Sequence, residues 1–425
     1  MTDVLVVLAD GRVMGEIRRS RAGRLTFVYD EGWRTSSNAY PLSLSMPLVV
    51  AEHEHGRIEP WLWGLLPDNE AILARWGQRF QVSPRNAFAL LSVVGEDCAG
   101  AIQLVAPDRV PALMEADQGS VAWLSASDIA ERLALLRKDQ SAWRVARDTG
   151  QFSLAGAQPK TALLFDGERW GVPSGRMATT HILKPPIDAF DGHAENEHLC
   201  LALARTLGLP AARSQVLRFG DEVAIVVERY DRLRSPTGIR RLHQEDLCQA
   251  LGLPPTKKYQ NEGGPGTTEM LEVIRSHSGE PQEDAWTFAR ACMFNWLIGG
   301  TDAHAKNFSM LIGAAGRARL APLYDVASTL VYDFDPRKLK LATKIGGKYL
   351  IEEIGPRQWE KFSSEARLPK QEVIIAANDM AGALPKAIHG VAEQARGDGL
   401  DHPVISRMVD ILSARAERCA RLLSD

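Results

Sequence analysis

The segment Leu297–Leu311, with the sequence LIGGTDAHAKNFSML, constrains the fold more than any other part of this chain. Apolar residues before it predict a helix that ends at the glycine pair 299–300, because glycine readily adopts the left-handed conformation that closes a helix. Apolar residues at 308–312 predict a short strand directly afterwards. Asp302 and Asn307 therefore fall in a tight loop beside apolar structure. Polar groups in such a place need a partner, so this loop is a candidate site.

The spacing of Asp302 and Asn307 is the one that phosphoryl transfer uses in protein kinases. There, an Asp receives the proton of the acceptor hydroxyl, while an Asn and a second Asp hold magnesium against the nucleotide phosphates. Four residues separate the catalytic Asp from the Asn in kinases, as they do here. A second strand expected at 319–323 leads into Tyr324 and Asp325, and Asp325 takes the place of the second Asp. The D-x-x-x-x-N pattern alone is common by chance, but the flanking helix, strand and acid strengthen it.

Length and composition predict a soluble globular protein. The 425 residues suffice for two or three packed units. The net charge of −3 argues against nucleic-acid contacts over the whole surface. Five cysteines without a C-x-x-C pair predict reduced thiols rather than disulfides or a zinc site. We find no signal peptide and no apolar run of roughly 20 residues. A cytoplasmic protein without membrane contact is therefore expected.

The first half of the chain is predicted to be rich in strands. A hairpin with strands at 4–8 and 13–18 is expected because Asp10-Gly11 is typical of two-residue turns. Helices are expected to begin at 68–70, at Ser83-Pro84 and at Ser127-Asp128, with a further helix at 195–207 and a linker at 106–120. Other strands are expected at 25–29, 99–105, 160–165, 169–172, 180–184, 216–219 and 223–230.

After Arg232 the pattern becomes mostly helical. Helices are expected at 245–251, 270–277, 285–298, 369–384 and 404–423. A β-rich half followed by a helical half that carries the charged loop is typical of a two-lobed kinase. We therefore predict an α+β protein with three parts: a β-rich subdomain at 1–107, a kinase N-lobe at 108–231 and a helical C-lobe at 232–425.

A kinase-like site also needs a lysine for the nucleotide phosphates, and Lys184, at the end of an expected strand, supplies one. Such a lysine usually pairs with a carboxylate on the next helix. Glu195 and Glu197 both open that helix, and Glu197 is the preferred candidate. From these residues alone, a surface lysine and acids that favour a helix start explain the pattern equally well. The strand end 228–230 could offer backbone groups to adenine, although an ordinary strand exit fits too.

The segment 153–161, SLAGAQPKT, resembles a phosphate-binding loop only loosely. Leu154 and Pro159 occupy the positions of the two Walker glycines, and the G-x-G-x-x-G pattern of protein kinases is absent. The small residues at 155–157 still permit a close approach of the backbone to phosphate, and Lys160 adds positive charge. Taken alone, this loop is more simply interpreted as a turn.

Longer stretches of the chain resemble the HipA family, the serine/threonine kinase toxins of bacterial toxin–antitoxin modules. The resemblance spans essentially the whole chain in one order. It rests on these segments: YPLSLSMP (40–47), LLPD (65–68), SLAGAQPKTAL (153–163), THILK (180–184), NE (196–197), VERYDR (227–232), HQED (243–246), GGPG (263–266) and WLIGGTDAHAKNFS (296–309).

The resemblance implies a two-lobed, protein-kinase-like fold with an extra N-terminal β-rich subdomain and a helical C-terminal lobe, with ATP and Mg²⁺ bound between the lobes. Asp302 would be the catalytic base and Glu197 the partner of Lys184. Ser153 would be a loop serine whose autophosphorylation expels the loop and silences the kinase. The implied metal ligands are Asn307 and Asp325. The implied ATP contacts are Ala155, Gly156, Ala157, Gln158, Pro159, Lys160, Lys184, Glu228, Arg229, Tyr230, His304, Ala305, Lys306, Asn307, Tyr324 and Asp325.

The resemblance also implies partners. These are a HipB-like helix-turn-helix antitoxin, operator DNA reached mainly through that antitoxin, and a protein substrate such as an aminoacyl-tRNA synthetase, whose phosphorylation arrests growth. Two alternatives stay open. A small-molecule phosphotransferase is disfavoured by the loop with Ser153 and by the N-terminal subdomain. A pseudokinase that serves only as a co-repressor is disfavoured by the simultaneous presence of Lys184, Asp302, Asn307 and Asp325.

Overall fold

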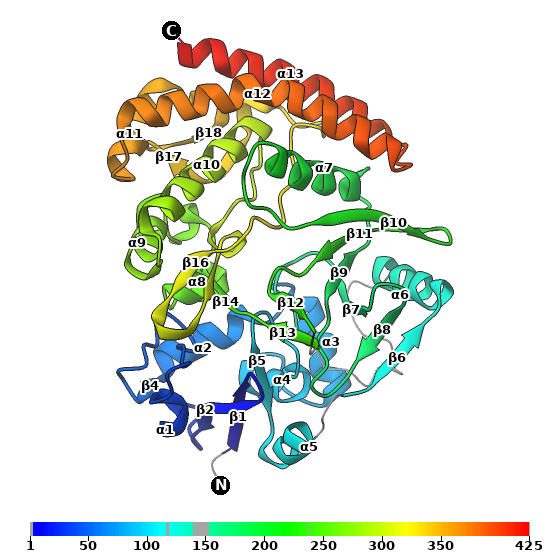
Figure 1. Cartoon of the computed structure of the whole chain (residues 1–425), viewed down its shortest axis with the longest axis vertical. Helices are drawn as coiled ribbons and strands as arrows, with labels where there is room; N and C mark the ends of the chain where they lie inside the picture. The colour runs from blue at the N-terminus through cyan, green and yellow to red at the C-terminus, as the bar shows by residue number, and fades with distance from the viewer. Residues whose placement is uncertain (1–2, 116–118, 139–152, 237, 425) are drawn as a thin grey trace. The chain divides into compact units, whose positions relative to one another are not determined.

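The computed structural model describes residues 3–115, 119–138, 153–236 and 238–424 (Figure 1). The chain forms two compact units, and each is described here by itself. Unit 1 comprises the described residues within Met1–Pro185, Arg218–Thr256 and Met310–Ala318. Unit 2 comprises those within Pro186–Leu217, Lys257–Ser309 and Arg319–Asp425. The expected three-part division of the chain stays a prediction.

Unit 1 begins with an antiparallel five-stranded sheet in the order β4-β3-β2-β1-β5. Asp10 and Gly11 both have positive φ, 51° and 72°, and connect the first two strands. This two-residue turn is the one that the Asp-Gly pair predicted. The strands are β1 (Asp3–Ala9), β2 (Arg12–Arg19), β3 (Leu25–Tyr29), β4 (Glu52–Glu54) and β5 (Ile102–Val105).

Six helices accompany this part of unit 1, and their starts show where local signals mislead. α3 begins after the cap Asn69, as expected, but the fourth helix starts after Asn86 and not at Ser83-Pro84. The Ser125 hydroxyl accepts from the Asp128 amide at 3.1 Å, so the sixth helix starts earlier than Ser127. The helices are α1 (Glu31–Arg34), α2 (His55–Gly64), α3 (Glu70–Phe80), α4 (Ala87–Val94), α5 (Val110–Glu115) and α6 (Ala126–Lys138).

The expected linker at 106–120 is wrong for most of its length. Residues Pro107–Arg109 form a 3-10 turn and α5 follows directly. Leu113 of α5 is buried against Val6 and Leu8 of β1. The burial of that apolar side chain stabilises a helix that the Pro- and Asp-containing sequence does not suggest. Residues 116–118 lie outside the described residues.

A second sheet of six strands has the order β10-β11-β9-β7-β8-β6, and its antiparallel ladders place β9 between β7 and β11. Three further strands follow where the sequence predicted mostly helix. Of the expected helix at 245–251, only Leu247–Ala250 (α8) is helical. The strands are β6 (Val121–Leu124), β7 (Thr161–Phe165), β8 (Trp170–Pro173), β9 (His181–Lys184), β10 (Ser214–Phe219), β11 (Glu222–Glu228), β12 (Arg232–Ser235), β13 (Gly238–Arg241) and β14 (His243–Asp246).

A buried cluster of charges lies within unit 1. The carboxylate of Asp97 is 2.9 Å from Arg232 and 3.2 Å from Arg241, and Asp231 is 2.8 Å from Arg229. Burial alone would raise the pKa of Asp97, but the three arginines hold it well below its usual range. Three guanidinium groups therefore depend on two carboxylates that come from distant parts of the sequence, and we call this set the arginine–aspartate cluster.

Unit 2 is mainly helical. Its two longest helices, α12 and α13, pack side by side (Figure 1). α12 continues through Pro385 to Gly397, well beyond the expected end at 384, because Ile388 and Val391 keep its apolar face buried. The helices are α7 (His193–Thr206), α9 (Thr267–His277), α10 (Pro281–Ile298), α11 (Pro356–Glu365), α12 (Lys370–Gly397) and α13 (Pro403–Ser424).

Short strands and 3-10 turns complete the chain. The strands are β15 (Ser309–Ile312), β16 (Ala318–Leu320), β17 (Lys340–Ile345) and β18 (Lys348–Leu350), and the last two form a hairpin. The 3-10 turns beside the candidate site are η3 (Gln260–Glu262) and η4 (Ala305–Asn307). No helix in the described part of the chain is both long and apolar enough to cross a membrane.

Candidate functional site

The helix that leads into the charged loop ends where the sequence predicted. Gly299 has φ 64°, and a Cβ at this position would lie 2.5 Å from the Leu330 side chain. The closing carbonyl groups of α10 are covered from α13, because the Arg415 guanidinium donates to Trp296 O and Leu297 O, both at 3.1 Å. This charged donor satisfies acceptors that a helix end leaves without partners. The loop therefore starts from a firmly fixed point.

Asp302 and Asn307 are held together by the loop itself. The Asp302 carbonyl accepts from the His304 amide at 2.8 Å and from Asn307 Nδ2 at 2.8 Å. The Asn307 amide donates to His304 O at 2.9 Å. Asn307 is buried, while 66 % of the Asp302 side-chain surface is exposed. The loop thus presents one accessible carboxylate beside an oriented carboxamide.

The segment after β16 brings a second carboxylate to unit 2. Leu323 is fixed on both sides, since its amide donates to Pro210 O at 2.9 Å and its carbonyl accepts from Ala212 at 2.8 Å. The Tyr324 hydroxyl donates to Lys306 O at 2.7 Å and so contacts the charged loop. Asp325 has φ 57°, a left-handed conformation that few residues other than glycine adopt. Backbone strain of this kind clusters at functional sites.

Asn196 ties the helix that carries Glu197 to the same segment. Its Nδ2 donates to Ser328 O at 2.8 Å and its Oδ1 accepts from the Ser328 amide at 2.9 Å. The Ser328 hydroxyl in turn donates to Ile298 O at 2.6 Å. This chain of contacts links α7, the segment after Asp325 and the end of α10. Sequence reasoning did not assign Asn196 a role, because only the tertiary structure shows what its amide reaches.

In unit 1 the loop with Ser153 is packed inward. Ser153 is fully buried; its hydroxyl donates to Leu65 O at 2.8 Å and its amide to Asp97 O at 3.0 Å. Gly156 has φ 105°, and its carbonyl accepts from the Asp68 amide at 3.2 Å. The loop is thus attached to residues 65–97 by backbone contacts. The earlier interpretation of this stretch as a plain turn understated how firmly it is held.

The two candidate phosphate-binding lysines lie on neighbouring strands. Thr161 pairs with Leu183, so Lys160 and Lys184 are at opposite ladder positions at one end of β7 and β9. Both side chains are largely buried. Lys160 Nζ donates to Ala155 O at 2.6 Å, inside the loop that it follows. The ladder therefore places both ammonium-bearing residues at the strand ends beside the glycine-containing loop.

The expected adenine segment 228–230 is only partly available. The Arg229 amide donates to Thr180 O at 2.9 Å, and its guanidinium belongs to the buried arginine–aspartate cluster. Tyr230 hydrogen-bonds through its hydroxyl to Gln244. Any contact of this segment with a base would therefore use the carbonyl groups or the neighbouring amides, and not the Arg229 side chain.

The residues present fit magnesium held jointly with phosphate. Asn307 Nδ2 is used by Asp302 O, which leaves the amide oxygen as the group that faces a ligand. Mg²⁺ is commonly bound by one or two carboxylates or amides together with substrate phosphates. No group of three or more His, Cys, Asp or Glu residues in the described ranges could by itself hold a metal ion. Asn307 and Asp325 would therefore need the nucleotide to complete such a site.

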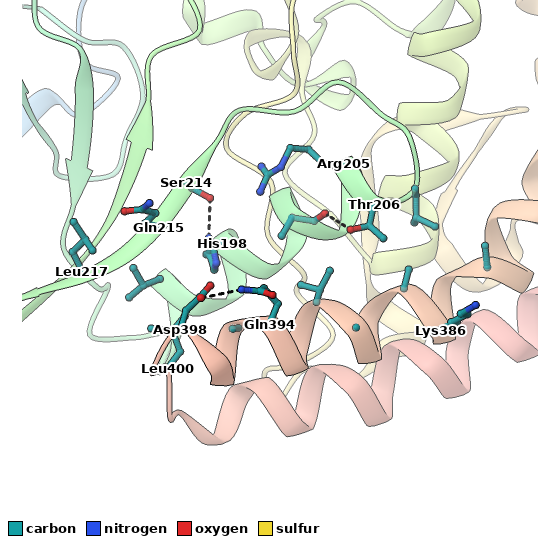
Figure 2. A pocket seen from close by; sticks show the side chains of 18 of the residues that line it. His198, Arg205, Thr206, Ser214, Gln215, Leu217, Lys386, Gln394, Asp398 and Leu400 are labelled. Atoms are coloured by element: carbon teal, nitrogen blue, oxygen red, sulfur yellow. Dashed lines mark hydrogen bonds between the residues drawn. The ribbon is translucent and has the colours of Figure 1, made fainter. Parts of the chain in front are cut away.

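A separate hollow in unit 2 contains none of these residues. It has a volume of about 960 Å³ and lies between α7, the start of β10 and α12 (Figure 2). His198 donates to or accepts from the Ser214 hydroxyl at 3.0 Å at its edge. Burial and the nearby Arg205 lower the pKa of His198 to about 4, so this imidazole is neutral at pH 7. Asp398 and Lys386 also line the hollow, but none of the residues expected to bind nucleotide or metal or to act in catalysis does.

Comparisons with known proteins agree with this geometry. The family model described as the HipA-like C-terminal domain matches residues 152–388, and the HipA N-terminal domain matches residues 5–105. The chain belongs to the HipA family. The C-terminal match contains every residue singled out above for ATP, metal or catalysis, and the N-terminal match covers the first sheet. The resemblance that the sequence motifs indicated is confirmed.

Individual members of the HipA family align over most of their length. A Sinorhizobium fredii protein named "Putative kinase Y4mE" is 37 % identical over 418 residues, with 97 % of this chain and 98 % of the relative covered. The Shewanella oneidensis serine/threonine-protein kinase toxin HipA is 30 % identical over 375 residues, covering 85 % of this chain and 82 % of that toxin.

A solved HipA structure shows the same fold. HipA from the Shewanella oneidensis complex of HipA, HipB and operator DNA superposes with a TM-score of 0.84 at 26 % identity, covering 99 % of this chain and 98 % of that chain. The expected α+β, kinase-like HipA fold with a β-rich N-terminal part is thereby confirmed.

Proposed function

We propose that this chain is an ATP- and Mg²⁺-dependent serine/threonine protein kinase. The observation that carries the proposal is the loop of unit 2, where Asp302 is exposed while its own carbonyl holds the Asn307 carboxamide at 2.8 Å. Asp302 would orient the acceptor hydroxyl and take its proton, and Asn307 with Asp325 would hold magnesium. The ion would stabilise the negative charge on the oxygens of the transferring phosphoryl group.

The nucleotide would be held by lysines and loop backbone. Lys184 and Lys160 would offset phosphate charge, and residues 155–159 would approach the phosphates through their small side chains. Glu197 would be the partner of Lys184. Further contacts would come from 228–230, from 304–307 and from Tyr324, as the family resemblance implies. Binding of nucleotide at Lys160 would require its ammonium to exchange Ala155 O for phosphate oxygen.

We further propose that autophosphorylation of Ser153 silences the kinase. In this structure the Ser153 hydroxyl is buried and donates to Leu65 O, and the Ser153 amide donates to Asp97 O. A phosphoserine carries roughly −1.5 to −2 charges and its oxygens only accept hydrogen bonds at neutral pH. It would be repelled by the carbonyl that the hydroxyl now contacts. The loop would therefore have to leave its present place.

As the biological setting we propose a toxin that a HipB-like antitoxin restrains, with operator DNA reached through that antitoxin. The support is the solved relative, which assembles with HipB and operator DNA. An aminoacyl-tRNA synthetase is the substrate class that the family resemblance suggests. Growth arrest on expression would follow from blocked translation.

The test is intact-mass analysis and peptide mapping after incubation with Mg²⁺ and ATP, starting from dephosphorylated protein. We expect one phosphate on Ser153 in the wild type and none in Asp302→Gln, with both proteins still binding nucleotide. Transfer only to metabolites would indicate a small-molecule phosphotransferase. Antitoxin and operator binding without any transfer, to itself or to lysate proteins, would indicate a co-repressor instead of a kinase.

A further inference from the structure

Tyr259 contacts the candidate catalytic base directly, although no motif of phosphoryl transfer includes it. Its hydroxyl donates a short hydrogen bond to Asp302 Oδ1. Its ring packs edge-on against His304, with 4.8 Å between the ring centroids. Both partners belong to the loop that presents Asn307, and all of these residues lie in unit 2. Tyr259 thus reaches two members of the charged loop from outside it.

The residues on both sides of Tyr259 are anchored. The preceding carbonyl, Lys258 O, accepts from the Ala305 amide of the charged loop at 3.3 Å. On the other side, Gln260 Oε1 accepts from the Lys344 amide of β17 at 2.7 Å. Because the neighbours on each side are tied to different elements, the backbone of Tyr259 cannot move away from the charged loop without breaking these hydrogen bonds. This anchoring argues for a fixed support and against a lid.

The glycine-rich motif that follows explains how this anchored turn is built. The Tyr259 carbonyl accepts from the amides of Glu262 and Gly264 at 3.1 and 2.9 Å. A Cβ on Gly264 would lie 2.1 Å from Lys257 O and 2.7 Å from Tyr259 O, which no side chain tolerates. The Gly-Gly-Pro-Gly sequence at 263–266 therefore serves to fold the chain back tightly enough to hold Tyr259 in place.

We propose that Tyr259 is the positioning residue for the catalytic base of this kinase. The side chain of Asp302 is mostly exposed, and His304 Nε2 lies 3.9 Å from the same Oδ1 that the phenol contacts. Without the short hydrogen bond from the phenol, the carboxylate would sample more rotamers. With Oδ1 bound by the phenol, the carboxylate is held in one orientation in which it receives the acceptor hydroxyl. Holding a reacting group in its productive geometry accounts for large rate factors. This inference rests on the proposed kinase function and adds a residue to its machinery.

The kinetic test compares Tyr259→Phe with wild type and with the control Tyr349→Phe. Phenylalanine keeps the ring on His304 and removes only the hydroxyl. Tyr349 lies on β18, where Lys344 Nζ is 5.1 Å from the centroid of its ring. We expect about a tenfold fall in kcat for phosphate incorporation with Mg²⁺ and ATP in Tyr259→Phe. The KM for ATP should stay unchanged, and Tyr349→Phe should behave as wild type. An unchanged kcat, or a loss confined to KM, overturns the proposal.

A second readout does not need catalysis. The melting temperatures of Tyr259→Phe, Asp302→Ala and the double variant form a double-mutant cycle. We expect Tyr259→Phe to lower the melting temperature in the wild-type background and to have no further effect in Asp302→Ala. Additive shifts would show that the hydrogen bond does not form in solution and would overturn the proposal even in an active kinase. Coupled shifts in a chain that transfers no phosphate would instead refute the kinase function and Tyr259's catalytic role together.

Discussion

Glu245 of β14 is a buried carboxyl group that no proposed step uses. Burial raises its pKa to about 8, while the Leu44 amide donates to Oε1 at 2.7 Å and opposes that rise. The group is therefore largely protonated in the folded protein at pH 7, whereas it ionises near 4.5 when the chain unfolds. Between pH 4.5 and pH 8 the folded state binds a proton at Glu245 that the unfolded state has lost. The stability due to Glu245 therefore falls as the pH rises through this range.

Glu245→Gln should remove this pH dependence, because a carboxamide has the shape of the protonated acid and does not ionise. The buried His181 and His243, whose pKa values are lowered to about 4, contribute the same pH dependence to wild type and variant, so they cancel in the difference between the two proteins. The wild type should lose roughly 1.4 kcal/mol per pH unit relative to the variant near pH 6.5, and about half of that per unit near pH 8. Urea unfolding measures this difference.

The matched control is Glu393→Gln on the exposed face of α12, which should retain the wild-type slope. Parallel curves for wild type and Glu245→Gln over this range would show that Glu245 is already ionised in the folded chain. The hydrogen bond from Leu44 would then outweigh desolvation.

At the scale of elements, the charged loop depends on a helix that is far away in the sequence. Arg415 of α13 is almost fully buried, closes the carbonyl end of α10 and pairs with Glu352 at 2.7 Å. Arg418, one turn later, pairs with the same Glu352 at 2.8 Å but keeps 56 % of its side chain exposed. The two arginines therefore separate the effect of capping α10 from the effect of an ion pair.

Arg415→Ala should destabilise the protein by about 3 kcal/mol, because it strips the buried α10 carbonyls of their charged donor. Arg418→Ala should lose less than about 1 kcal/mol, as expected of an exposed pair. Chemical denaturation of both variants checks the difference. Equal losses would assign the stabilisation to Glu352 and not to the helix end.

At the scale of the whole molecule, the two family domains do not coincide with the two compact units. Asp97 falls in the N-terminal match, 5–105, whereas Arg229, Arg232 and Arg241 fall in the C-terminal match, 152–388. All four belong to unit 1. The N-terminal family domain thus supplies one of the two carboxylates that pair with three guanidinium groups of the C-terminal family domain, and its Asp97 carbonyl also receives the Ser153 amide.

Asp97→Asn should therefore lower the free energy of unfolding by roughly 3–5 kcal/mol, since it leaves buried arginines without a full counter-charge. It should also loosen the loop at Ser153, which limited proteolysis followed by peptide mapping would detect as new cleavage between 153 and 160. Asp335→Asn, which removes a half-buried surface carboxylate paired with the exposed Arg337, should leave both readouts at wild-type values. A stable Asp97→Asn protein with a protected loop would contradict this account.

The sequence predicted features whose cause is local. Asp10-Gly11 specifies its turn by backbone preference, and Gly299 ends α10 for the same reason. The D-x-x-x-x-N spacing places its two residues on one loop. Features whose cause is tertiary were missed. α2 contains Pro60, which argues against a helix, yet its Trp61 is fully buried in the core. The strands β12–β14 fill a region expected to be helical, where β12 and β13 carry arginines that need the distant Asp97.

The residues of the candidate site also fall into those that the sequence identified and those that only the tertiary structure shows. Asp302, Asn307, Asp325 and Lys184 were identifiable because phosphoryl transfer fixes residue type and spacing. Their assigned roles stay predictions. The supporting residues Tyr259, Asn196 and Arg415 were not identifiable, because each acts through a contact with a segment tens of residues away. Only the Gly-Gly-Pro-Gly sequence after Tyr259 offered a hint, since such a tight turn must hold something in place.

The burial of Arg415 has a genetic consequence. A stop codon or frameshift anywhere upstream of residue 415 removes the guanidinium that closes α10, even when every residue of the charged loop has been translated. If the chain is toxic to its host, cells that survive its expression without an antitoxin will include truncations within the last few dozen codons. Sequencing such survivors would map the requirement for the C-terminal helix without a single designed variant.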